Sequence, residues 1–187
     1  MRIVICMFVA ILATSCGGAG LTVVKSAGKA AFAGQKNFSS QPIAITNLQV
    51  DGKPEAEFLA RKNAKFMSGW EADKSSLDVN FQKSLQERAA KSGITIVSGN
   101  AAPFTIHPTI SWIETGYYRI PAWNAISRIK MNVTITDSKG AVLEELNMED
   151  KMHMDVMLAP DSGGRLRGIA RMLGARLANY LKTQTSP

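Results

Sequence analysis

Alternation of apolar and polar residues between positions 104 and 155 constrains the fold of this 187-residue chain more than any other feature. Three segments alternate in this way: residues 104–112, 127–136 and 146–155. A period of two puts the apolar side chains on one face of a strand, and strands with one dry face are typical of an antiparallel sheet covered on one side. The turn Asp137–Gly140 joins the last two segments into a hairpin.

Pro108 interrupts the first of these segments. Proline cannot donate a backbone hydrogen bond, so we predict that this strand lies at a sheet edge or contains a bulge. Its expected apolar face consists of Phe104, Ile106, Ile110 and Trp112. An earlier strand is predicted over Pro42–Val50. Its apolar residues change from odd to even positions near Thr46-Asn47, which predicts a bulge there. A shorter strand is predicted over Ile94–Val97.

Two amphipathic helices are predicted to cover the sheet. The first is capped by Ser75 or Ser76 and ends at Ser92-Gly93, and four apolar residues form its stripe: Leu77, Phe81, Leu85 and Ala89. The second opens at Asp161–Gly164 and gathers its apolar residues in one narrow arc. This order of elements predicts an α+β fold with two layers, in which two main helices lie on one face of a mostly antiparallel sheet of four to five strands.

Residues 1–15 have the layout of a secretory signal peptide. Arg2 precedes the apolar run Ile3–Ala13, which is too short to cross a bilayer, and small residues follow it. Cys16 comes directly after them, and its position resembles the lipobox of bacterial lipoproteins, although Ala13 stands where such families prefer leucine. The resemblance implies that Cys16 is acylated, with chains such as palmitate, and becomes the first residue of the mature protein.

Other fates of the leader stay open. An ordinary signal peptidase could cut after Ser15 or Ala19 and release a soluble periplasmic protein, whereas the length of the apolar run argues against an uncleaved anchor. In the resemblance, aspartate after the cysteine signals retention in the inner membrane; here that residue is Gly17. The sequence therefore favours the outer membrane, with the protein facing the periplasm.

The domain boundaries follow from this leader. We expect a signal peptide over residues 1–15, a lipidated cysteine and flexible tether over 16–40, and a single α+β domain over 41–187. A first short strand near Leu21–Lys25 is compatible with the tether sequence. Cys6 is removed with the leader, so the mature chain has no internal disulfide.

The chain carries a net charge of +7. Such a charge suits nucleic acid, anionic lipid or an acidic protein, and export makes nucleic acid the least suitable of these partners. Alternatively, the charge serves only to keep the protein soluble.

Residues that could perform chemistry do not form a convincing set. His107, His153 and Asp155 could be assembled into a metal or base site on paper, but solvated sheet histidines are the simpler interpretation. The acidic pairs Glu144-Glu145 and Glu149-Asp150 are interpreted as solvated surface, since neighbours in a strand point to opposite faces. We therefore expect a protein that is not an enzyme, with no catalytic residues, no metal and no cofactor.

Three groups of residues are candidates for binding. The segment 113–123 is a predicted loop whose aromatic and cationic residues suit an interface: Tyr117, Tyr118, Arg119 and Trp123. The last helix has a basic face that suits anionic lipid or an acidic partner: Arg167, Arg171 and Lys182, with Arg165 and Arg176 at its margin. The methionines at 148, 152, 154 and 157 either fill a core or line an apolar groove.

The ensemble resembles small α+β bacterial envelope lipoproteins, such as the auxiliary lipoprotein of lipid-transporting ABC systems and related uncharacterised families. The resembling parts are the Cys16 leader, Phe81–Leu85, Ser92-Gly93, Phe104–Ile106, Thr136–Leu143 and the C-terminal helix. The pattern covers residues 75–183, and the resemblance implies no catalytic residues.

Three hypotheses follow. The first is an outer-membrane-anchored, non-enzymatic assembly or transport accessory that binds an envelope protein through its sheet edge and the 113–123 loop. The second is a periplasmic carrier of a lipid or other apolar ligand, and the third is an undetected hydrolase using His107 or His153.

Overall fold

The computed structural model describes residues 20–116, 126–153 and 161–186. Its eight strands are β1 (Gly20–Ser26), β2 (Asn37–Ser40), β3 (Ala44–Val50), β4 (Lys53–Pro54), β5 (Thr95–Ser98), β6 (Phe104–Glu114), β7 (Ile126–Asp137) and β8 (Val142–His153). Its helices are the 3-10 turn η1 (Lys29–Ala31) and the α-helices α1 (Glu55–Leu59), α2 (Ala64–Ala90) and α3 (Ser162–Thr185). Within these ranges, no helix is both long and apolar enough to cross a membrane.

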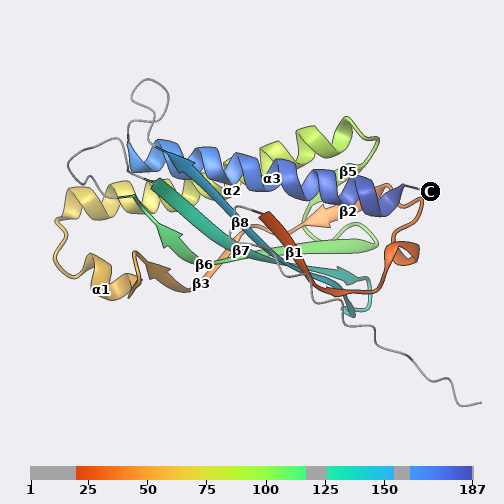
Figure 1. The fold of residues 1–187 in the computed structure, drawn as a ribbon, viewed down its shortest axis with the longest axis horizontal. Helices are drawn as coiled ribbons and strands as arrows, with labels where there is room; N and C mark the ends of the chain where they lie inside the picture. The colour runs from red at the N-terminus through yellow and green to blue at the C-terminus, as the bar shows by residue number, and fades with distance from the viewer. Residues whose placement is uncertain (1–19, 117–125, 154–160, 187) are drawn as a thin grey trace, which may run out of the picture.

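The strands form one sheet in the order β1-β8-β7-β6-β2-β5, while β3 also pairs with β6 and β4 pairs with β3. The pairs from β1 through β8 and β7 to β6 are antiparallel, whereas β2 and β3 run parallel to β6 and β5 runs parallel to β2. Helices α2 and α3 lie side by side on one face of this sheet (Figure 1). The predicted α+β class is therefore confirmed, but the sheet has eight strands instead of four or five.

The predicted meander is confirmed in β7 and β8. Every second residue of β7 is buried beneath the helices: Ser127, Ile129, Met131, Val133 and Ile135. In β8 the same face buries Leu146 and Met148. The bulge expected near Thr46-Asn47 is also present, because the register of β3 against β6 shifts between Ile45 and Gln49.

The position of Pro108 corrects one expectation. Strand β6 lies inside the sheet: β2 pairs with it as far as Ile106, and β3 pairs with it from Thr109 onward. Pro108, which has no N–H to donate, lies between the two stretches. The bulge that we considered as the alternative is present: the register of β6 against β7 shifts between Ile110 and Trp112.

This register shift also changes which residues of β6 point toward the helices after Ile110. Ile113 is fully buried, whereas Trp112, which we expected on the covered face, is half-buried with the Lys130 ammonium 4.8 Å from its ring centre. A bulge moves every later side chain to the other face, which is why simple alternation failed here.

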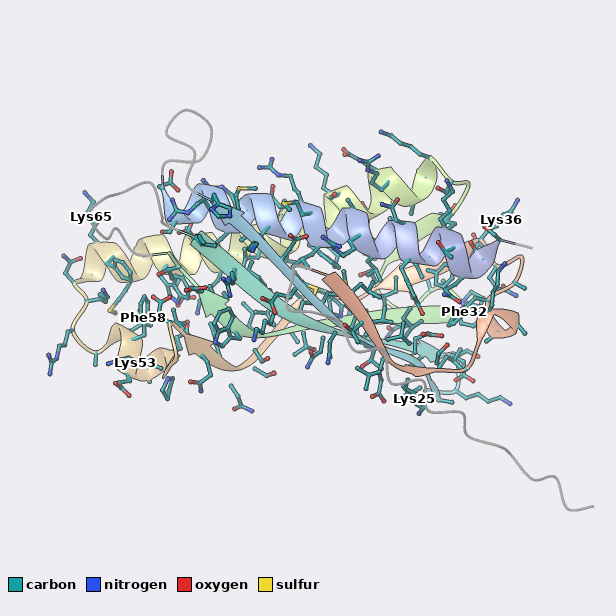
Figure 2. The ribbon with its side chains drawn as sticks, in the orientation of Figure 1. Lys25, Phe32, Lys36, Lys53, Phe58 and Lys65 are labelled. Atoms are coloured by element: carbon teal, nitrogen blue, oxygen red, sulfur yellow. The ribbon has the colours of Figure 1, made fainter. Side chains whose placement is uncertain are left out.

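Residues 20–40, which we predicted to belong to a flexible tether, form two strands of the sheet. Strand β1, near the short strand considered for Leu21–Lys25, pairs with β8, and β2 is inserted between β5 and β6. Phe32, labelled in Figure 2, is buried, as is Phe38, and both rings pack against that of Phe104. From Gly20 onward this segment therefore belongs to the domain, because its aromatic side chains complete the core.

Helix α2 is longer than predicted. It begins at Ala64, where Asn63 caps it by accepting a hydrogen bond from the Phe66 N–H (2.9 Å), and it passes Ser75 and Ser76 without interruption. The predicted stripe from Leu77 to Ala89 is buried, together with Trp70.

Helices α2 and α3 run parallel. Asp73 contacts Arg167, and further along Ser84 donates a hydrogen bond to the Arg171 carbonyl oxygen (2.7 Å). Gly174 lies against the carbonyl oxygen of Phe81. Both helices therefore begin at the same end of the molecule (Figure 1).

Candidate functional site

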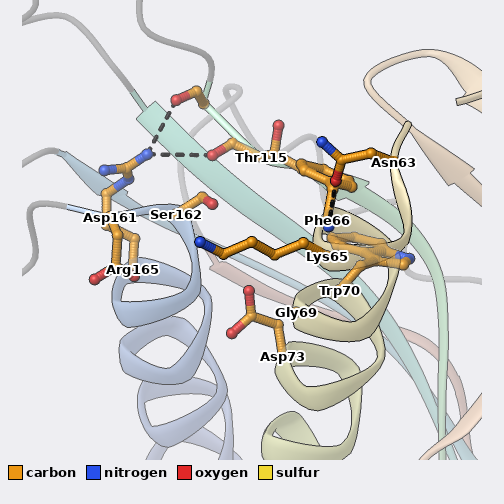
Figure 3. A pocket seen from close by; sticks show the side chains of 11 residues that line it. Asn63, Lys65, Phe66, Gly69, Trp70, Asp73, Thr115, Asp161, Ser162 and Arg165 are labelled. Atoms are coloured by element: carbon orange, nitrogen blue, oxygen red, sulfur yellow. Dashed lines mark hydrogen bonds between the residues drawn. The ribbon is translucent and has the colours of Figure 1, made fainter. Parts of the chain in front are cut away.

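A cavity of about 480 Å³ opens where α2 and α3 begin, beside the end of β6 (Figure 3). Its lining comes from three segments far apart in the sequence: Asn63, Lys65, Phe66, Gly69, Trp70 and Asp73 from α2 and its cap, Thr115 and Gly116 after β6, and Asp161, Ser162 and Arg165 from the start of α3. The parallel packing of the two helices brings these segments together.

The α2 wall of the cavity is aromatic and anchored by α1. Trp70 is buried, and its indole N–H donates a 2.6 Å hydrogen bond to Glu55, which also accepts one from Lys74 (2.7 Å). Burial raises the pKa of the Glu55 carboxyl, but the hydrogen bonds from Lys74 and Trp70 and the charge of Lys74 outweigh it, so this pKa lies below its ordinary value. Phe66 lies at the mouth and stays 37% exposed.

The floor is formed by Arg165, which is only 3% exposed. Its guanidinium donates a hydrogen bond to the Ser127 hydroxyl (2.9 Å). It also donates to the carbonyl oxygens of Thr115 (3.3 Å) and Gly116 (3.0 Å) (Figure 3). Burial lowers the pKa of Arg165, partly offset by the negative charge of Asp161. The hydrogen bonds of Arg165 therefore connect the start of α3 to the end of β6 and the start of β7.

Two carboxylates stand at the start of α3. Asp161 caps the helix by accepting a hydrogen bond from the Gly164 N–H, and Asp73 pairs with Arg167 at 3.0 Å. Burial raises the pKa of Asp73, and the negative charge of Asp161 raises it further. The charge of Arg167 and its hydrogen bond lower this pKa, but the net pKa lies above its ordinary value. A Cβ at position 163 would collide with the Asp73 carboxylate, so a side chain there would displace that carboxylate.

The cavity offers both signs of charge beside an aromatic wall. Lys65 extends from α2 toward α3 across the opening (Figure 3). Among the residues of the described ranges that line the cavity, none is a histidine or a cysteine. This arrangement suits polar contacts with a ligand or with a partner's side chains.

The histidines do not meet. In the register of the sheet His107 is opposite Thr134 and His153 is opposite Ile126, so they are separated by about 27 Å along β7. His107 contacts the Thr136 hydroxyl at 3.1 Å, and His153 is exposed at the end of β8. Over residues 20–116, 126–153 and 161–186, no group of three or more His, Cys, Asp or Glu side chains could hold a metal.

The basic face of α3 is partly used inside the fold. Arg165 is buried, Arg167 pairs with Asp73, and Arg176 donates to Asp150 at 2.7 Å. Arg171 is exposed, as is Lys182. The structure therefore leaves fewer arginines for an external partner than the sequence pattern indicated.

Two carboxylates interpreted as surface residues are instead buried beneath α3. Glu144 accepts hydrogen bonds from Ser26 and from the Tyr180 hydroxyl, both at 2.6 Å, and Asp150 receives the bond from Arg176. Burial raises the pKa of Tyr180, as do its hydrogen bond to Glu144 and the charge of that carboxylate. The alternation along β8 could have indicated their burial, because it places both acids on the same face of the strand as Leu146.

The methionines of β8 fit the core interpretation as far as they are described. Met148 is 1% exposed, and the Met152 side chain lies against Gly168 of α3, where a Cβ would collide with it. Several predicted residues lie outside the described ranges: Cys16, Tyr117, Tyr118, Arg119, Trp123, Met154, Asp155 and Met157.

Sequence reasoning missed the cavity as a site. Asp161 was recognised at a helix start, but nothing in the sequence connected it with Lys65, Trp70 or Asp73.

No protein-family model and no curated protein matches the chain. Among solved structures, PelC from Paraburkholderia phytofirmans, crystallised as a dodecamer, is similar over 88% of this chain and 98% of its own, with 11% identity and a TM-score of 0.50. Protein XCC0632 from Xanthomonas campestris (DUF330) covers 86% and 92% at 6% identity and a TM-score of 0.49. A minor lipoprotein from Acinetobacter baumannii covers 80% and 89% at 11% identity, with a TM-score of 0.35. The likeness to PelC shows a common fold.

Proposed function

We propose that the protein is a non-enzymatic lipoprotein of the bacterial envelope, held at the periplasmic face of the outer membrane by acylated Cys16, where it serves as an assembly or transport accessory. The observation that carries this proposal is the closeness of the anchor to the fold. Strand β1 begins at Gly20, and three residues separate it from Cys16. Such a short spacer suits a domain that works at the membrane surface.

The absence of enzymatic activity is part of the proposal. His107 and His153 are far apart, and the polar groups of the cavity floor hold the fold together: Arg165 binds backbone carbonyls and Asp161 caps a helix. A nucleophile would need a base within hydrogen-bond reach. The histidine hydrolase is therefore less well supported than the accessory.

We place the contact with an envelope partner at the cavity. Phe66 in its lining is 37% exposed, and the next residue in the chain, Met67, is 43% exposed, although both are large apolar side chains. Thr115 and Gly116, the last described residues of the 113–123 segment before its undescribed part, belong to the same lining. An exposed aromatic residue next to a polar recess is a common interface anchor.

Self-association is the first oligomeric state to test. PelC, whose fold is similar, is a dodecamer. We propose that this chain also assembles with copies of itself at the membrane, and light scattering of the detergent-extracted protein measures the number of copies.

The carrier is the weaker alternative. It would need an apolar space between sheet and helices, but Met148 and Leu146 are buried there against α3, and Gly168 fits closely over Met152. The described core is filled at these positions, which supports the accessory.

Acylation is tested by intact mass of the membrane-extracted protein. The wild type is expected to begin at Cys16 and to carry the mass of its acyl chains in the outer-membrane fraction, whereas Cys16→Ser should be unacylated and lost from the membrane. Cys6→Ser is the matched control, because the leader is removed. A native chain that begins elsewhere, unmodified, would overturn the anchor.

The partner contact is tested by a photo-cross-linking residue at position 66, with position 79 as control. Val79 is 65% exposed on the same helix. We expect an adduct from position 66 and none from position 79 in intact envelopes. Equal labelling at both positions, or none at 66, would remove the cavity from the proposed interface.

A further inference from the structure

The length of the spacer limits where β1 can lie. Four residue steps connect Cys16 to Gly20, and an extended chain spans at most about 3.6 Å per residue, which gives a reach of about 14 Å. If Cys16 is acylated, its acyl chains enter the bilayer and Cys16 itself lies at the surface. The beginning of β1 is therefore confined to the vicinity of the lipid headgroups.

Strand β1 is also an edge of the sheet. It pairs with β8 on one side, and among the described strands none pairs with its other side. An open edge presents unpaired backbone groups, which proteins usually cover or protect. The opposite edge is β5, at the far end of the strand order.

Two exposed valines mark this edge. Val23 and Val24 are 39% and 57% exposed. The register against β8 passes from Val23, opposite Leu146, to Lys25, opposite Glu145, so Val24 is an extra residue in a bulge. Bulges change the direction of a side chain, and this one displays a valine that the fold does not use.

A cation follows the valines directly. Lys25 is exposed and lies on the side of the sheet away from the helices (Figure 2). By the same register Val23, opposite Leu146, is on the helix-covered face, which leaves Val24 as the apolar neighbour of Lys25. An apolar side chain beside a lysine suits the boundary between acyl chains and anionic headgroups. A soluble partner would not explain why this group lies within 14 Å of the anchor, about the length of four extended residues.

We propose that the open edge of β1, with Val24 and Lys25, rests on the lipid bilayer into which Cys16 is anchored. The inference depends on the proposed acylation of Cys16. The bilayer covers the edge, Val24 enters the headgroup boundary, and Lys25 contacts anionic headgroups. The helices then lie on a different side of the sheet from Lys25.

The experiment uses nitroxide labels on the acylated, full-length mature protein in vesicles of phosphatidylethanolamine and phosphatidylglycerol. Cys6 leaves with the leader and an acylated Cys16 has no free thiol, so Val24→Cys provides a single labelling site. Val97→Cys is the matched control, since Val97 is a 39% exposed valine on the opposite edge strand β5. Relaxation of each label by oxygen and by a water-soluble nickel chelate reports its depth.

We expect the label at position 24 to gain oxygen accessibility and to lose nickel accessibility several-fold on vesicles, with little change at position 97. Equal nickel accessibility at both positions on an acylated protein would overturn the inference and leave the anchor intact. Spin–spin broadening at position 24 without vesicles would also overturn it, because a second copy would then cover the edge. A mass without acyl chains would reject the anchor and this inference together.

Discussion

Gly174 of α3 lies so close to Phe81 of α2 that a Cβ at position 174 would collide with the Phe81 carbonyl oxygen. The contact involves backbone, which cannot move aside as a flexible side chain can. The glycine therefore sets the distance between the two parallel helices at this point.

Gly174→Ala is expected to destabilise the protein by about 1–3 kcal/mol, the usual cost of overpacking a core. Gly69→Ala is the control, because a Cβ there meets nothing within 4 Å in the same helix pair, and alanine should stabilise α2 by up to about 1 kcal/mol. Urea unfolding of both variants measures the difference. Equal stability of the two variants would contradict this account of the helix contact.

Glu55→Gln is expected to change how stability depends on pH. Hydrogen bonds from Lys74 and Trp70 and the charge of Lys74 outweigh burial and lower the folded pKa of Glu55 below the ordinary value of 4.5. The carboxylate therefore stabilises the fold above pH 4.5, and this stabilisation is lost as the pH falls through the lowered folded pKa. The difference in unfolding free energy between wild type and variant should be greatest near neutral pH and shrink in acid. Unfolding curves across this range measure it, and a difference that grows in acid would show the assigned sign to be wrong.

Asp161→Ala is expected to cost about 0.5–2 kcal/mol, because the Gly164 N–H at the start of α3 loses its acceptor. Asp161→Asn keeps a capping oxygen and removes the charge, so it should retain most of the stability. Thermal unfolding compares the two variants. A large loss for asparagine as well would mean that the charge of Asp161, rather than its hydrogen bond, holds the helix start.

Tyr180→Phe is expected to cost about 1–3 kcal/mol, since it leaves the buried Glu144 carboxylate without one of its two donors. In wild type, burial raises the pKa of Tyr180, and the bond to Glu144 raises it further. Alkaline titration followed by phenolate absorbance should therefore show one tyrosine that ionises late and is missing in the variant. Tyr180→Phe with unchanged stability and an unchanged late phase would contradict the buried pair.

Much of the fold was predictable because it depends on local periods. The buried face of β7, the turn at Asp137–Gly140 and the stripe from Leu77 to Ala89 were each read from neighbouring residues. The same reasoning gave Asp161 at the start of α3. These elements form a meander and two helices, in which sequence neighbours are also neighbours in space.

The rest depends on long-range pairing. Strand β2 has four residues and runs parallel to both of its partners, so it shows no alternation long enough to recognise. The short strand predicted over Ile94–Val97 corresponds to β5, but its parallel pairing with β2 has no signal in the local sequence. The sequence around Phe32 and Phe38 shows no regular spacing of apolar residues, although both side chains belong to the core. In α2, the stretch before Leu77 buries Trp70 but exposes most of its other residues, which concealed the helix start at Ala64.

The cavity could not be predicted for a similar reason. Its residues come from three segments that carry no motif, and their meeting depends on the direction in which α3 lies beside α2. Glu144 and Asp150 illustrate the same limit, because their burial requires Tyr180 and Arg176 from a helix that follows them in the chain.

The common direction of α2 and α3 has an electrical consequence. Peptide dipoles in two antiparallel helices largely cancel, whereas those of α2 and α3 add, giving the domain a polarity along its length with the positive pole at the helix beginnings. Beside a negatively charged leaflet, such a polarity produces a torque that turns the positive pole toward the surface, within the roughly 8–10 Å over which salt leaves the field unscreened. The tilt of the molecule should therefore respond to ionic strength.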